Sequence, residues 1–128
     1  MPSSTPLYRA QALVQFASTL LQRAGMGTSQ ADCVANTLVE GDLLGHDTHG
    51  LQLLAGYVKE LETGSMKGQG APLVVSDRPA ALLWDGQRLP GPWLVLQAIE
   101  LALQFQTPHW KMQRVVLIDK NVSNRKTE

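Results

Sequence analysis

Apolar residues recur every three or four positions in the first half of the chain, and this spacing is typical of amphipathic helices. It predicts helices over residues 4–25, from about residue 28 up to the sequence GHDTHG, and over residues 51–64. The apolar stripe of the first helix is formed by Leu7, Ala10, Val14, Ala17, Leu21 and Ala24. The expected buried faces of the other two are formed by Ala31, Val34, Ala35, Leu38 and Val39, and by Leu54, Val58 and Leu61.

Residues that favour helix ends support these boundaries. Ser4 or Thr5 can cap the first helix, with Pro6 in its first turn. Ser29 and Asp32 have the spacing of a capping box at the start of the second helix. Glycines follow the first and third helices, where they are expected to end them.

The hydrophobic pattern changes after a glycine-containing loop over residues 65–72. Short apolar or β-branched runs predict strands at residues 72–77, 80–86 and 114–119. Helical spacing returns over residues 90–106, with Trp93, Leu96, Ile99 and Leu103 along one side. This order predicts an α+β fold, in which N-terminal helices are followed by a partial sheet and a helix.

The composition narrows the possible classes of function and of partner. Hydrophobic residues make up 44% of the 128 residues and charged residues 17%, as in globular proteins. The formal net charge is zero, which argues against a nucleic-acid partner, because binding a phosphate backbone needs an excess of basic residues. No apolar run is long enough to span a membrane, and the N-terminus lacks the pattern of a signal peptide. Cys33 is the only cysteine, and we expect it to be a small buried apolar residue. A single cysteine excludes an internal disulfide, so we expect a cytoplasmic protein, and we expect no membrane partner.

The sequence GHDTHG is the strongest candidate for chemistry. If the second helix continued through it, His46 and His49 would share a face with Asp42 one turn earlier. Two imidazoles and a carboxylate can hold zinc or iron. Gly45 and Gly50 indicate that the chain turns here, so we expect no metal site.

Two other interpretations of GHDTHG remain open on spacing alone. A histidine can take a proton from an alcohol or return one to a ketone near neutral pH. Thr48 could then hydrogen-bond a substrate oxygen, and Asp42 or Asp47 could orient the imidazole. Alternatively, these residues only cap helix ends and link two helices. Tyr57, in the next helix, is either a ligand anchor or a core aromatic residue.

A family resemblance bears on this choice. It is carried by ADCVANTLVEGDLLGHDTHGLQLLAGYVKELETGSM and by PAALLWDGQRLPGPWLVLQAIELAL, and it extends from about Leu7 to Gln104. The first stretch is similar to a helix, an Asp-Leu pair, a Gly-His-Asp-Ser/Thr-His-Gly signature, a Tyr and a later Gly. In this order the motifs resemble the malate/L-lactate dehydrogenase family, which also contains ureidoglycolate, sulfolactate and piperideine-2-carboxylate oxidoreductases.

The resemblance implies an enzyme that uses NAD or NADP to move a hydride between nicotinamide and a 2-hydroxy or 2-imino acid. It implies a dimer with a non-Rossmann fold and a small 2-hydroxy or 2-keto acid substrate. Thr48 and His49 match active-site positions, with His49 as the acid–base candidate, and Tyr57 matches a position that lines the substrate pocket. His46 belongs to the signature but is not itself the base.

The implied organisation follows the same resemblance. Residues 1–68 form a helical region with the active-site signature, residues 69–119 begin the cofactor-binding α/β region, and residues 120–128 are a disordered tail.

Two departures from the family pattern affect the expected activity. Many members place an Arg shortly after the signature, where it suits a substrate carboxylate, and this chain has Leu53 there. From about residue 105 the sequence does not resemble the family's continuation, as a frameshift would produce. We therefore expect a truncated form that lacks a second His, a catalytic Lys and most of the cofactor contacts, and that is inactive alone. The alternative function is a non-catalytic helical module for dimerisation or docking onto a partner.

Overall fold

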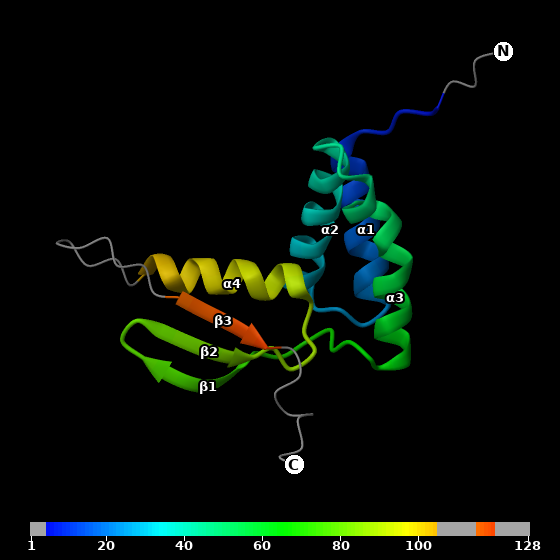
Figure 1. Ribbon diagram of the computed structural model, residues 1–128. Coiled ribbons are helices and arrows are strands. Elements are labelled where there is room, and N and C mark those ends of the chain that lie inside the picture. The colour runs from blue at the N-terminus through cyan, green and yellow to red at the C-terminus, as the bar shows by residue number, and fades with distance from the viewer. Residues whose placement is uncertain (1–4, 105–114, 120–128) are drawn as a thin grey trace.

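The computed structural model describes residues 5–104 and 115–119, and shows a helical bundle beside a small sheet (Figure 1). The bundle consists of α1 (Ala10–Arg23), α2 (Thr28–Leu43) and α3 (Leu54–Thr63). The sheet consists of β1 (Leu73–Arg78), β2 (Ala81–Asp85) and β3 (Val115–Asp119), and α4 (Gly91–Gln104) lies along it. This arrangement confirms the predicted α+β class. None of the helices in the described ranges is long and apolar enough to cross a membrane.

The bundle is built on the predicted faces of α1 and α2. Every residue of the face predicted for α2 is buried, and Ala17 and Leu21 of α1 are fully buried against it. Leu54 of α3 is buried in the same cluster, and Val58 and Leu61 pack on it. Ser18 donates a hydrogen bond of 2.5 Å to Oδ1 of Asp32, which ties α1 to α2 at the edge of this core.

The predicted start of the first helix is wrong, whereas the second helix begins at Thr28 as predicted. The first helix begins at Ala10, with extended Arg9 as its N-cap, and Thr5 and Pro6 precede it outside any helix. Leu7 is 97% exposed, so no burial offsets the cost of extending the helix over these residues. The other predicted cap, Ser4, lies outside the described residues.

The predicted capping box of the second helix is also absent. Gly27 is the N-cap of α2, and no side chain caps it. Ser29 lies inside the first turn, and Asp32 accepts its hydrogen bond from Ser18 of α1. A tertiary contact therefore takes the carboxylate that the local pattern had assigned to the helix end.

The three predicted strands form one sheet in the order β1-β2-β3. β1 and β2 are antiparallel, with Leu73 paired to Asp85 and Arg78 to Ala81, and an irregularity falls between Val74 and Ser76. β2 and β3 are parallel, and α4 provides the crossover between them. The predicted tail over residues 120–128 lies outside the described residues.

A second, smaller apolar cluster lies between the sheet and α4. It contains Leu82, Trp84 and Ala98, with Leu101 and Ile118 packed against it. The residues of α4 that are buried are Leu94 and Ala98. The side predicted from spacing is largely at the surface, because Leu96, Ile99 and Leu103 are 46%, 48% and 52% exposed.

The loop between α3 and β1 is bonded to both parts. The N–H of Gly27, before α2, donates to the carbonyl of Gly68 over 2.9 Å. The N–H of Lys67 donates to the carbonyl of Arg88 over 2.9 Å, and Nη1 of Arg88 donates to the carbonyl of Gly64 over 3.1 Å. The same few residues therefore contact the bundle and the turn that follows β2.

Candidate active site

The end of α2 determines how the chain enters GHDTHG. Gly45 has φ of +78°, a left-handed conformation that glycine adopts without steric cost. The N–H of Gly45 donates to the carbonyl of Asp42 over 3.0 Å, and the N–H of His46 to the carbonyl of Gly41 over 2.9 Å. This pair of bonds is a Schellman motif, which closes the helix. The second helix thus ends before the two histidines.

Two short 3-10 turns carry the chain from α2 to α3. The first is η1 (Asp47–His49), in which the N–H of His49 donates to the carbonyl of His46 over 2.8 Å. The second is η2 (Leu51–Leu53), which leads directly into α3. In Figure 1 this connection lies at the end of the bundle that is remote from the sheet.

Thr48 and His49 form a side-chain pair on this connection. Oγ1 of Thr48 lies 2.8 Å from Nδ1 of His49, and both residues are exposed. A hydroxyl can either donate or accept a hydrogen bond, so Thr48 can pair with either tautomer of the imidazole. With Nδ1 occupied, Nε2 is the ring nitrogen left for a ligand.

Asp42 does not orient this imidazole directly. Its Oδ2 accepts a hydrogen bond of 2.9 Å from the backbone N–H of Leu51, on the far side of the signature. The sequence pattern suggests Asp42 only as a metal ligand or as a partner of the imidazole. The glycines at positions 41 and 50 were the signal of this close backbone packing.

The geometry does not support the metal interpretation of the two histidines. That interpretation required α2 to continue through His46 and His49, and the helix ends at Leu43. Within the described ranges, no group of three His, Cys, Asp or Glu residues is placed to hold a metal ion. His46 is exposed, its N–H donates to the carbonyl of Gly41, and its carbonyl accepts from the N–H of His49.

Tyr57 lies on α3, partly buried against the helical core. Burial raises the pKa of its phenol above the ordinary value of 10.0, and the charges of Glu60 and Cys33 raise this pKa further. The hydrogen bonds of the described residues do not connect Tyr57 to Thr48 or His49. Cys33, expected to be buried, is only partly so, and burial is also the main cause that raises the pKa of its thiol.

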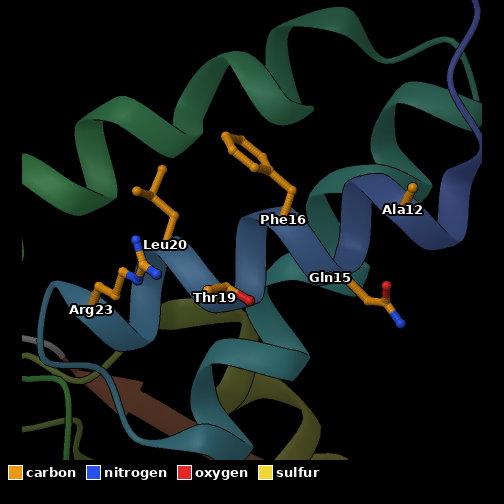
Figure 2. Close-up of a pocket in the computed structure, with 6 residues that line it drawn as sticks. All are labelled: Ala12, Gln15, Phe16, Thr19, Leu20 and Arg23. Atoms are coloured by element: carbon orange, nitrogen blue, oxygen red, sulfur yellow. The ribbon is translucent and has the colours of Figure 1, made fainter.

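The surface hollow shown in Figure 2 is separate from the signature. It has a volume of about 400 Å³, and its lining comes entirely from α1. Phe16 and Leu20 both point toward the neighbouring helix in this view, whereas Gln15 points away from it. Arg23 is the one charged group among the lining residues, so this hollow offers no acid–base pair.

Comparison with known proteins decides the family. Residues 8–109 match the malate/L-lactate dehydrogenase family. This chain belongs to the malate/L-lactate dehydrogenase family. The match covers α1 to α4 and the signature, so the resemblance inferred from the motifs is confirmed.

Individual members of the family are similar over the same region. Hydroxycarboxylate dehydrogenase B of Escherichia coli is 28% identical over 102 residues, which cover 80% of this chain and 28% of that protein. L-lactate dehydrogenase of Cupriavidus necator is 35% identical over 72 residues, which cover 56% of this chain and 21% of that protein. The chain therefore spans less than a third of the length of the curated relatives it matches.

Solved structures show the same relationship in the fold. The malate dehydrogenase of Pyrococcus horikoshii superimposes with a TM-score of 0.71 at 28% identity, over 74% of this chain and 27% of that one. The bundle and partial sheet thus correspond to part of a larger dehydrogenase fold.

Proposed function

We propose that the signature of this chain is half of the active site of an NAD- or NADP-dependent oxidoreductase acting on a 2-hydroxy or 2-imino acid. The observation that carries the proposal is the exposed Thr48–His49 pair, held on a turn in a member of this dehydrogenase family. The names of its relatives specify hydroxycarboxylates, malate and L-lactate as their substrates.

The geometry suits proton transfer in both directions. With Nδ1–H donating to the Thr48 hydroxyl, neutral His49 has a free lone pair on Nε2 and can accept the proton of an alcohol. In the reverse direction, doubly protonated His49 keeps the Nδ1–H bond to Thr48 and gives the Nε2 proton to a ketone oxygen. A bound nicotinamide would supply or accept the hydride, and His49 would give or take the proton at Nε2.

The remaining roles are assigned with the same proposal. Tyr57 lines the substrate pocket, residues 1–68 carry the signature, and residues 69–119 begin the cofactor-binding region. Neither the motifs nor the described side chains form a phosphate cradle, so no residue of this chain is assigned to hold the nucleotide. The enzyme works as a homodimer in the cytoplasm.

The 128 residues alone are proposed not to turn over substrate, because they span about 28% of the length of the Escherichia coli relative. The direct test is to mix the purified chain with pyruvate-like acids and NADH or NADPH. We expect no oxidation of the cofactor. Turnover that disappears in His49→Ala would contradict this part of the proposal.

A chimera tests the role of the signature itself. Residues 8–109 replace the corresponding part of the Escherichia coli hydroxycarboxylate dehydrogenase, and cofactor oxidation with 2-keto acids is measured. His49→Ala is expected to lower the rate by about 100-fold or more, the usual contribution of an acid–base group. Thr48→Val should cost about tenfold, the effect of one lost hydrogen bond. His46→Ala is the matched control, and an unchanged rate in His49→Ala would exclude the assigned role.

The apolar surface of α4 favours a second candidate, a module that associates with another protein. Val95, Leu96, Ile99 and Leu103 are all at least 46% exposed, and contiguous apolar patches of this kind mark interaction surfaces. Turnover by the chimera distinguishes the candidates, and the oligomeric state of the purified chain tests the second one. A clean monomer at high concentration counts against the association module.

A further inference from the structure

We propose that Asp42 is a positioning residue that fixes the direction of the His49 imidazole through the backbone of Gly50 and Leu51. The inference rests on the role proposed above for His49. It assigns no contact between Asp42 and a substrate.

The carboxylate of Asp42 connects the end of α2 to the backbone that follows the signature. Asp42 lies in the last turn of α2, and its Oδ2 accepts the N–H of Leu51 over 2.9 Å, nine residues along the chain. Its carboxyl group also occupies the space beside the α-carbon of Gly50. A Cβ added to Gly50 would overlap Oδ1 and Cγ of Asp42.

The need for glycine at position 50 is a matter of space. Gly50 has φ of −97° and ψ of −154°, which is extended backbone that any residue can adopt. It is nevertheless buried, although Thr48 and His49 just before it are exposed. The carboxylate of Asp42 thus packs where a side chain would otherwise be.

Gly41, the residue before Asp42 in α2, lies close to the backbone of His49. A Cβ at Gly41 would lie 2.7 Å from the carbonyl oxygen of His49, which is backbone and cannot swing away. The N–H of His49 is bonded to the carbonyl of His46. The N–H of His49 is therefore bonded within the turn, its carbonyl lies close to Gly41 of α2, and the N–H of Leu51 is bonded to Asp42 of α2. These contacts on both sides of His49 limit the directions in which its side chain can leave the turn.

The experiment uses the 128-residue chain and does not depend on turnover. Amide exchange of Leu51 and the imidazole ¹⁵N shifts of His49 are measured by NMR in Asp42→Ala, Asp42→Asn and Glu40→Gln. In Asp42→Ala we expect exchange of Leu51 to rise about three- to tenfold, as for loss of one exposed hydrogen bond, with a shift of the His49 signals. Asp42→Asn keeps an acceptor oxygen and should restore the exchange rate of Leu51 and the His49 signals. Glu40→Gln removes an exposed carboxylate of the same helix and should leave the exchange rate and the signals unchanged.

A second measurement applies even if one variant folds poorly. Gly50→Ala should destabilise the chain strongly with Asp42 present and much less in the Asp42→Ala background, since the overlap is then relieved. Equal losses in the two backgrounds would overturn the proposed packing. Equal shifts of His49 in Asp42→Asn and Asp42→Ala would show an effect of charge and overturn the positioning role. Neither outcome depends on the chimera, whose failure would affect only the catalytic role of His49.

Discussion

The phenol of Tyr57 is held in its neutral form by its surroundings. Burial in the helical core raises its pKa above 10.0, and the neighbouring carboxylate of Glu60 adds to the effect. The unfolded chain, with the ordinary pKa, therefore loses this proton at a lower pH than the folded chain does. Below about pH 10 the group leaves stability unchanged, and above it the free energy of unfolding falls as the pH rises toward the folded pKa.

The titration of Tyr57 can be followed by the absorbance of tyrosinate. In Tyr8→Phe, Tyr57 is the one remaining tyrosine. We expect the midpoint of the folded protein to lie above that of the same protein in denaturant, and Glu60→Gln to move it down. Coinciding midpoints in the folded and denatured protein would show that the phenol is not shielded in the core.

The candidate site residues were proposed from the sequence, whereas one of the contacts that positions them could not be predicted from it. The order of residues around GHDTHG was enough to single out Thr48 and His49. The bond from Leu51 to Asp42 depends on the path of the backbone through two 3-10 turns, which residue spacing does not encode. The roles of Thr48, His49 and Tyr57 remain predictions.

At the scale of elements, two glycines of the bundle allow a matched test of helix termination. Gly45 has φ of +78° after α2, whereas Gly56 lies inside α3, and a Cβ at either would meet no atom within 4 Å. Gly45→Ala should lower the free energy of unfolding by about 1 kcal/mol, because alanine is strained in the left-handed region. Gly56→Ala should raise it by about 0.5–1 kcal/mol.

Urea denaturation of both glycine variants provides the measurement. The two changes add the same methyl group into open space, so a difference in sign isolates the backbone conformation. Destabilisation of similar size in both variants would mean that the methyl group, and not φ, is responsible.

The elements themselves differ in how well the sequence predicts them. The buried face of α2 follows from spacing, because that helix has one apolar side. α4 is apolar on more than one side, so spacing could not show that Leu94 and Ala98 face inward while Ile99 does not. The start of α1 depended on whether Leu7 finds a core to pack against, and this is a tertiary property.

At the scale of the whole molecule, the exposed side of α4 predicts self-association. Ile99 and Leu103 are about half exposed on a helix that contacts the sheet with another side. We expect concentration-dependent oligomers of the purified chain, and a larger monomer fraction in Ile99→Glu combined with Leu103→Glu. Size-exclusion chromatography with light scattering provides the measurement.

The control for self-association is Phe16→Glu. Phe16 is also exposed, at 61%, but it lies on α1. The Phe16→Glu substitution should leave the monomer fraction unchanged. An equal effect of the Phe16 and α4 variants would indicate nonspecific adhesion of apolar side chains.

The loop between α3 and β1 has a consequence for motion. Its backbone at Gly68 is bonded to Gly27, and its backbone at Lys67 to Arg88, so the same short segment grips the bundle and the turn after β2. Swinging the sheet away from the bundle would break the bond between Gly27 and Gly68 or the bond between Lys67 and Arg88, depending on which part the loop stayed with. The loop therefore restrains the sheet relative to the bundle and is not a flexible hinge between them. A change in the angle between the sheet and the bundle is therefore opposed by backbone hydrogen bonds on both sides of this loop.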